Sequence, residues 1–241
     1  MVSSFLWALG GTQFIFFMTA LGASLVFFFP GAQLRFQKAL LGFAGGVMTA
    51  ASVWSLLLPA IAQTEAESAL PAWLPAALGL ILGALFILLA DALQRGAAGK
   101  ERLLFTAITL HNIPEGMAVG LAFALAADGE GLAAALALAL GIGVQNFPEG
   151  AAVSLPLRQL GPGRAFLCGA ASGAVEPVFG LLAFGAARWV HPLMPWLLSF
   201  SAGAMLYVTA CELCPESQGR VGTLGYIGGF ALMMTLDIAL G

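Results

Sequence analysis

Two six-residue strings place carboxylates and prolines inside strongly apolar parts of the chain. Residues 111–116 read His-Asn-Ile-Pro-Glu-Gly, and residues 145–150 read Gln-Asn-Phe-Pro-Glu-Gly. A carboxylate at the depth of a bilayer is costly, and a proline inside a helix removes a backbone hydrogen bond. The occurrence of both features together, in two separate apolar stretches, favours an ion pathway in a membrane transporter over a role in packing.

Helical spacing predicts that the polar side chains of each string share one face. Glu115 follows Asn112 by three residues and His111 by four, which are the separations of neighbours on a helix surface. The second string repeats this spacing with Gln145, Asn146 and Glu149. One imidazole, two carboxylates and three amide oxygens form a donor set suited to a divalent metal ion.

A third carboxylate, Glu176, also stands beside a proline near the middle of an apolar stretch. No Lys or Arg occurs at this depth in any expected span, so protons or a metal dication must neutralise three buried carboxylates. Taken singly, a protonated glutamate, a core histidine or an interhelical asparagine also has an explanation in packing. The combination of Glu115, Glu149 and Glu176 with His111 favours a metal site.

The elements that must position these residues are transmembrane helices. The chain is 60% hydrophobic and 9% charged, with a mean hydropathy of +0.96, which is far outside the range of soluble domains. Apolar runs of spanning length lie at residues 5–29, 39–61, 72–93, 102–127, 131–155, 164–187, 193–213 and 222–240. We therefore expect an all-α polytopic membrane protein with eight transmembrane helices, forming a single transporter domain over residues 1–241.

The basic residues predict the orientation of these helices. With the N-terminus outside, eight of the nine Lys and Arg residues fall in cytoplasmic loops, namely Arg35, Lys38, Arg95, Lys100, Arg102, Arg158, Arg164 and Arg220. This bias places both termini outside. The three cysteines match no disulfide framework, and no basic patch suggests a nucleic-acid partner.

An internal repeat relates the two central spans. Residues 111–122 and 145–156 are identical at seven of twelve positions, and the two spans run in opposite directions through the membrane. Inverted repeats of this kind recur in secondary transporters. A weaker echo links residues 46–48 (Gly-Val-Met) with residues 203–205 (Gly-Ala-Met), and it indicates a 3+2+3 arrangement of the helices.

These features resemble the ZIP (Zrt-, Irt-like protein) family of divalent-metal transporters, in its small GufA-type bacterial branch. The resemblance covers the whole chain and rests on the two strings, the eight-span layout, and residues 44–48 and 212–217. It implies a binuclear transport site and elevator-like access, in which the first, fourth, fifth and sixth helices slide past the others. One metal position would use His111, Glu115, Gln145, Glu149 and Met48, and the second Asn112, Glu115, Asn146, Glu149 and Glu176.

Three features depart from the pattern of that family. Asn146 stands where some relatives carry an aspartate, so the second metal position has one negative charge less. The loop at residues 95–102 is short and lacks histidine, which argues against metal sensing there. Cys211 replaces a histidine that often precedes the glutamate ending the seventh helix. Cys211, Glu212 and Cys214 form either a soft exit site at the cytoplasmic end or an ordinary polar helix terminus.

We expect a carrier, not an enzyme, that brings Zn²⁺, and also Fe²⁺, Mn²⁺ or Cd²⁺, into the cytoplasm through a bacterial plasma (inner) membrane. Mixed nitrogen and oxygen donors favour a borderline metal over Mg²⁺ or Ca²⁺, and proton competition is expected to weaken uptake at acid pH. An intramembrane metalloenzyme, an exporter and a channel are the alternatives, although the chain has no His-Glu-x-x-His motif. Divalent metal ions and the lipid bilayer are the expected partners, and the choice between monomer and homodimer stays open.

Overall fold

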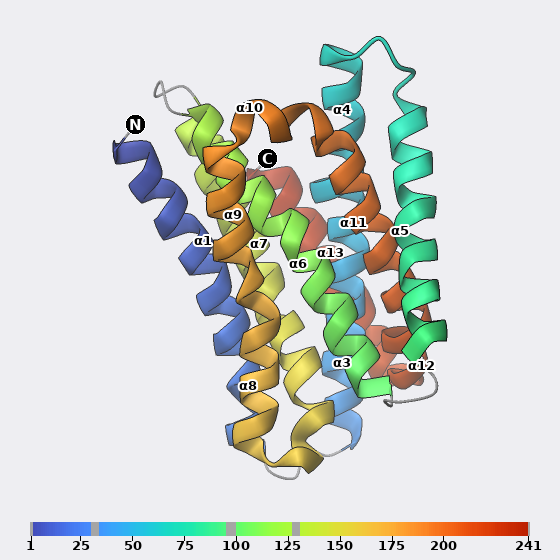
Figure 1. The fold of residues 1–241 in the computed structure, drawn as a ribbon. Coiled ribbons are helices and arrows are strands. Elements are labelled where there is room, and N and C mark those ends of the chain that lie inside the picture. The colour runs from blue at the N-terminus through green and yellow to red at the C-terminus, as the bar shows by residue number, and fades with distance from the viewer. Residues whose placement is uncertain (1, 30–33, 95–99, 127–130, 241) are drawn as a thin grey trace.

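Every regular element in the described part of the chain is a helix (Figure 1). The computed structural model describes residues 2–29, 34–94, 100–126 and 131–240. In chain order the elements are α1 (Val2–Ala23), α2 (Leu25–Phe28), α3 (Leu34–Ala51), η1 (Ser52–Leu57), α4 (Leu58–Glu67), α5 (Trp73–Gln94), α6 (Lys100–Leu125), α7 (Leu132–Ser154), η3 (Pro156–Leu160), α8 (Pro162–Gly173), α9 (Val175–Gly185), α10 (Ala187–Val190), η4 (His191–Leu193), α11 (Met194–Val208), η5 (Thr209–Leu213), α12 (Cys214–Glu216) and α13 (Arg220–Leu240). The all-helical class expected from the sequence is confirmed.

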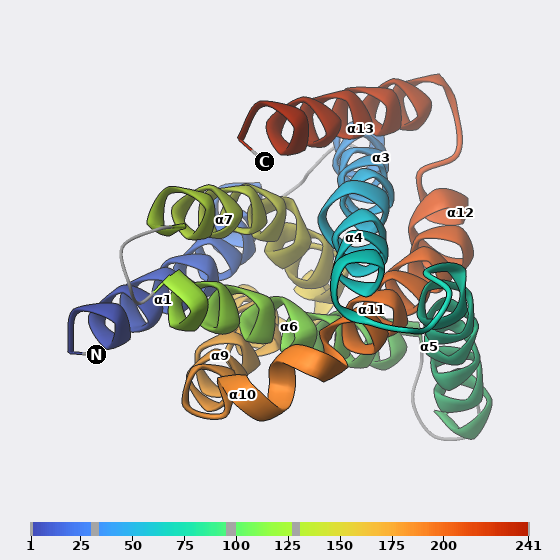
Figure 2. The ribbon, with the colours of Figure 1, turned by 90° about the horizontal axis from the view of Figure 1, so that it is seen from above.

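Six helical stretches of the described chain are long and apolar enough to cross a membrane. They are Ser4–Phe28, Arg35–Glu67, Trp73–Ala90, Pro162–Gly185, His191–Glu216 and Arg220–Ala239. The two helices that carry the polar strings, α6 and α7, have 26 and 23 residues and lie among them (Figure 2). At 1.5 Å per residue these two helices are about 39 and 34 Å long, enough for a bilayer core of about 30 Å. The class of polytopic membrane protein is confirmed.

The distribution of polarity is the reverse of that in a soluble domain. Large apolar side chains lie on the outer surface, among them Phe28 and Leu224, which are 71% and 69% exposed. Glu115, Glu149 and Glu176 are at most 1% exposed. This distribution is expected where lipid is the outer solvent and polar groups gather inside the bundle.

The second helical stretch extends beyond the range expected from apolar residues. It runs from Leu34 through Glu67, whereas the apolar run covers residues 39–61. Polar residues such as Lys38 and Gln63 continue the helix at its two ends. The length of the apolar run therefore underestimates the length of the helix.

Two of the long stretches contain a π-helical turn just before a proline. In the first, η1 precedes Pro59, and in the second, η5 precedes Pro215. A proline ring clashes with the carbonyl group four residues earlier in an α-helix. The wider π-helical turn accommodates this clash without ending the helix.

Four helix pairs have the most extensive packing: α3 with α13, α5 with α11, α1 with α7, and α6 with α9. In the view of Figure 2, the helices α1, α6, α7 and α9 form one group and α3, α5, α11 and α13 lie beside it. The groups meet where α7 contacts α3 and α13, and where α6 contacts α11. Figure 1 shows both chain ends at the same end of the bundle.

Candidate metal-binding site

The three buried carboxylates come from three different helices of one group. Glu115 lies on α6, Glu149 on α7 and Glu176 in the first turn of α9. Both α6 and α7 continue through their internal prolines, Pro114 and Pro148. The break between α8 and α9 comes directly before Glu176, so that the carboxylate stands near the positive end of the α9 dipole.

Two consecutive amides on α7 connect these carboxylates. Gln145 donates a hydrogen bond through Nε2 to Oε1 of Glu115 on α6. Asn146 donates through Nδ2 to Oε1 of Glu176 on α9, at 2.9 Å. The two side chains of α7 therefore reach the two neighbouring helices, and they bring the first string, the second string and Glu176 into one buried group.

The amides of this group use their nitrogen atoms for protein contacts. Asn112 on α6 donates through Nδ2 to the backbone oxygen of Ser172 at 2.9 Å, and Asn146 also reaches the backbone oxygen of Ile15 at 3.3 Å. Within the described residues, the amide oxygens of Asn112, Gln145 and Asn146 are buried without a hydrogen-bond partner. Because such oxygens normally find a partner, the arrangement suits a bound cation or water.

The glycine that ends each string permits close contact with a neighbouring helix. A Cβ atom on Gly116 would lie 2.4 Å from the backbone oxygen of Glu176. A Cβ atom on Gly150 would lie 1.9 Å from the backbone oxygen of Thr19 on α1. Any larger residue would push these backbones apart, so the two glycines bring α9 against α6 and α1 against α7 at the depth of the carboxylates.

Two of the expected metal ligands, His111 and Met48, have no described contact with this group of carboxylates and amides. His111 lies within α6, but its side chain is outside the described part of the structure. Met48 on α3 is fully buried and belongs to the main apolar cluster, as does Met205 on α11. The surroundings of Met48 are those of a core residue, and they do not test its expected role as a metal ligand.

The expected exit-site residues lie at the far end of α11 and its continuation. The thiol of Cys211 is exposed, whereas Cys214 is partly buried, and both are free cysteines. Glu212, which lies between them, is partly buried as well. Figure 1 shows α12, which begins at Cys214, at the end of the bundle opposite the two chain ends.

Among the described residues, no three His, Cys, Asp or Glu side chains cluster in the manner of a metal site. The central group instead combines the carboxylates of Glu115 and Glu176 with the amides of Gln145 and Asn146. In the described part of the chain, the atoms of this group that could bind a metal ion are therefore largely carboxylate and amide oxygens.

Two polar residues near this group were missed by the sequence analysis. Thr19 on α1 is fully buried and its hydroxyl lies 3.2 Å from Oε1 of Glu176. Ser172, at the end of α8, accepts the Asn112 hydrogen bond through its backbone oxygen. Threonine and serine are frequent in transmembrane helices, so only their tertiary contacts distinguish these two residues.

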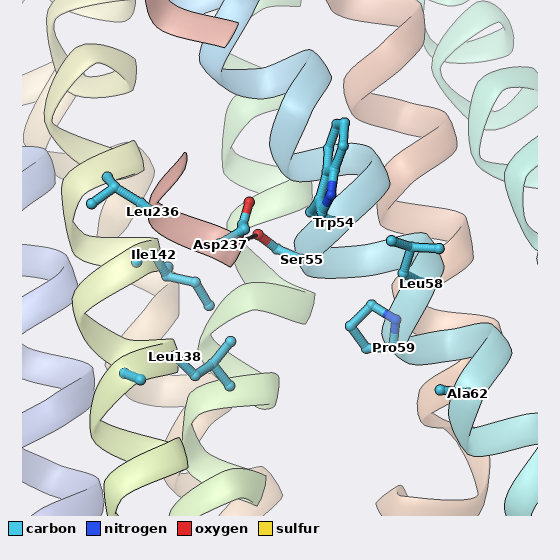
Figure 3. A pocket seen from close by; sticks show the side chains of 11 residues that line it. Trp54, Ser55, Leu58, Pro59, Ala62, Leu138, Ile142, Leu236 and Asp237 are labelled. Carbon is cyan, nitrogen blue, oxygen red and sulfur yellow. Dashed lines mark hydrogen bonds between the residues drawn. The ribbon is translucent and has the colours of Figure 1, made fainter. Parts of the chain in front are cut away.

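A third missed residue, Asp237 on α13, lines a cavity of about 400 Å³ (Figure 3). Its Oδ1 atom accepts a hydrogen bond of 2.7 Å from the hydroxyl of Ser55 on η1. The cavity lies between the η1–α4 stretch, α7 and α13, and is lined by Trp54, Ser55, Leu58, Pro59, Ala62, Ala137, Leu138, Gly141, Ile142, Leu236 and Asp237. Ile142 lies one helical turn before Gln145 and Asn146, so the cavity and the central group share α7.

The fold defines a polytopic α-helical membrane protein whose interior holds carboxylates and amides. Residues 100–237 match the family model described as ZIP Zinc transporter. The chain is 35% identical to the zinc transporter ZIP11 of Homo sapiens, with 99% of this chain and 98% of that protein covered. It is 36% identical to the zinc transporter GufA of Myxococcus xanthus, with coverage of 92% and 94%, and 39% identical to the zinc transporter ZIPB of Bordetella bronchiseptica, with coverage of 94% and 79%.

The chain belongs to the ZIP family of zinc transporters. The resemblance to this family, including its GufA-type members, is confirmed. Membership supports transport of divalent metal ions across a membrane, and it places the chain among transporters and not among enzymes.

Proposed function

We propose that this protein carries Zn²⁺ into the cytoplasm through the group formed by α6, α7 and α9. The observation that carries the proposal is the orientation of three buried amides beside buried carboxylates. Asn112, Gln145 and Asn146 donate through nitrogen to the protein, and their oxygens have no hydrogen-bond partner among the described residues. A divalent cation satisfies such oxygens and neutralises the carboxylates at once.

The proposed site holds two metal ions. The first position comprises His111, Glu115, Gln145, Glu149 and Met48, and the second Asn112, Glu115, Asn146, Glu149 and Glu176. The hydrogen bond between Gln145 and Glu115 and that between Asn146 and Glu176 support this division, because each couples members of one position. An imidazole in the first position favours Zn²⁺, with Fe²⁺, Mn²⁺ and Cd²⁺ as further substrates.

The proposed transport cycle is an elevator-like movement of one helix group against the other. The packing of α1 with α7 corresponds to that of α9 with α6, and the packing of α3 with α13 corresponds to that of α11 with α5. The π-helical turns before Pro59 and Pro215 occupy corresponding helices as well. These correspondences support a 3+2+3 inverted repeat of eight spans, in which α1, α6, α7, α8 and α9 form the moving part.

The proposed orientation has both termini outside the cytoplasm, in a bacterial inner membrane. The positive-inside bias of the loops supports this orientation, and the two chain ends lie at the same end of the bundle. The cavity beside Asp237 then lies toward the outer side, where metal ions would enter. The partly polar end formed by Cys211, Glu212 and Cys214 lies toward the cytoplasm, where its two sulfur ligands would accept a departing borderline metal.

The test is zinc uptake by the purified protein in proteoliposomes. Glu115→Gln and Glu149→Gln are expected to abolish uptake, because each removes a charge shared by both proposed metal positions. Glu65→Gln, an exposed residue of α4, is the matched control and is expected to keep the rate of the unaltered protein. Normal uptake by Glu115→Gln protein would overturn the proposal.

An imposed pH gradient and the saturation of flux with metal concentration separate uptake by a carrier from export and from a channel.

A further inference from the structure

Glu176 has two hydrogen-bond donors on one carboxylate oxygen. The Nδ2 atom of Asn146 lies 2.9 Å from Oε1 of Glu176, and the hydroxyl of Thr19 lies 3.2 Å from the same atom. Asn146 belongs to the second Pro-Glu-Gly string, whereas Thr19 belongs to α1, which has no part in either string. Thr19 therefore connects a further helix to the carboxylate.

The contact of Thr19 is unusual for a threonine in an apolar helix. Such a hydroxyl ordinarily bonds to a backbone oxygen of its own helix. Thr12, two turns earlier on α1, does so at 2.8 Å to the backbone oxygen of Ala8. The hydroxyl of Thr19 is 3.3 Å from the corresponding oxygen of Ile15 and slightly closer to Glu176. Unlike Thr12, Thr19 has a carboxylate oxygen within hydrogen-bond distance of its hydroxyl.

Tight packing keeps Thr19 at this position. A Cβ atom on Gly173 at the end of α8 would lie 2.8 Å from the Cβ atom of Thr19, and one on Gly150 of α7 would lie 1.9 Å from its backbone oxygen. Only glycine at these two positions lets α7 and α8 approach α1 so closely. The backbone of α1 is therefore held against α7 and α8 at the position of Thr19.

We infer that Thr19 is a positioning residue for metal binding, which holds the Glu176 carboxylate in the orientation that the second metal position requires. The inference rests on the proposed function, because it assigns Glu176 to a metal ion. Thr19 and Asn146 both contact Oε1, so together they restrict the rotation of the carboxylate. Hydrogen bonds that orient a liganding side chain typically contribute 10- to 100-fold to metal affinity.

The test compares four variants of the full-length protein. Thr19→Val removes the hydroxyl with little change in shape, Thr19→Ala removes it with less bulk, and Thr19→Ser restores it. Thr12→Val is the matched control on the same helix. Zn²⁺ affinity is measured by calorimetry on purified protein, and the KM and maximal rate of Zn²⁺ uptake are measured in proteoliposomes.

Thr19→Val is expected to weaken Zn²⁺ affinity and raise KM about 10-fold, the lower end of the effect of an orienting partner, with the maximal rate retained. Thr19→Ser and Thr12→Val are expected to match the unaltered protein. Thr19→Ala carries the same expectation as Thr19→Val, so that a folding defect in one of them leaves the test intact.

Unchanged affinity in Thr19→Val and Thr19→Ala would overturn the inference. Equal losses in Thr12→Val and Thr19→Val, or a Thr19→Ser protein as impaired as Thr19→Val, would overturn it too, because both results indicate packing alone. Uptake by Glu115→Gln protein distinguishes a failure of the Thr19 inference from a failure of the proposed function. If Glu115→Gln abolishes uptake while Thr19→Val binds normally, the role of Thr19 fails and the proposed function stands. If Glu115→Gln transports normally, the proposed function itself fails.

Discussion

The two ends of the central polar group hold their carboxylates in different ways. Glu115 is bonded by Gln145 and follows His111 by one helical turn on α6. Glu176 is bonded by Asn146 and by Thr19, and it stands in the first turn of α9. The Glu115 string has the only imidazole of the two strings, whereas the Glu176 carboxylate has two neutral donors.

For the proposed function, this difference predicts unequal metal positions. An imidazole and a carboxylate form a strong site for a borderline metal, whereas amides and hydroxyls add orientation without charge. In the proposed site, the Glu115 end would hold the transported ion and the Glu176 end would tune its binding. Glu115 and Glu149 contribute to both proposed positions, while Glu176 contributes to one.

The largest expected effect separates Glu115 from Glu176. Glu115→Gln is expected to lower uptake more than about 100-fold, beyond the usual loss for a supporting partner, because both metal positions lose a charge. Glu176→Gln is expected to raise KM about 10-fold and to keep measurable uptake, because one position stays complete. Initial rates of Zn²⁺ uptake over a range of metal concentrations measure both. Equal losses in the two variants would show that the two ends act as one site.

His111→Ala is expected to weaken Zn²⁺ uptake about 10-fold and to reduce the preference for Zn²⁺ over Mn²⁺. The reason is that imidazole nitrogen is the donor that most favours a borderline metal over one that prefers oxygen. Competition between Zn²⁺ and Mn²⁺ during uptake measures the change, with Glu65→Gln protein as the control. A variant with reduced uptake and unchanged preference would place His111 outside the metal position.

Asn146→Asp is expected to tighten the second position several-fold, because a carboxylate replaces a neutral amide beside Glu176. The same change removes the Nδ2 donor, so two carboxylates face each other and require a cation between them. Calorimetry is expected to show tighter binding of the second Zn²⁺ and a steeper loss of binding at acid pH, since more protons compete. An unchanged affinity for the second Zn²⁺ would contradict a metal position at this end.

Asp237→Asn has the smallest expected effect, an increase in KM of about 3-fold. A single carboxylate beside a cavity raises the local concentration of cations, and the field of one charge is modest. The effect is expected to diminish at high ionic strength, where the charge is screened. Uptake assays at low and high salt measure it. A loss as large as that of Glu115→Gln would place Asp237 within the transport site itself.

Much of the central group could be predicted from residue spacing. The separation of Asn112 and Glu115, repeated in Asn146 and Glu149, placed the polar residues on helix faces that the structure shows to be buried. Glu176 was recognised because a carboxylate beside a proline is rare in an apolar span. The hydrogen-bond partners of these residues could not be predicted, because the bond from Asn146 to Glu176 depends on which helices pack together.

Thr19 and Asp237 show more clearly which contacts residue spacing cannot predict. Thr19 and Thr12 stand in the same apolar helix, and among the described contacts Thr19 alone of the two reaches a carboxylate. Asp237 stands near the end of its span, where a charge is ordinary. Its contact with Ser55 arises because α13 packs along the stretch that contains η1.

The sequence by itself determined the solvent of this protein and the chemistry of its interior. A chain with 60% hydrophobic residues must lie in lipid, and its few carboxylates inside the spans must then face one another or an ion. Tertiary structure decided which donor meets which carboxylate. Contacts at Gly116 and Gly150 set the approach of four helices, and hydrogen bonds depend on distances of tenths of an ångström that no pattern in one chain specifies.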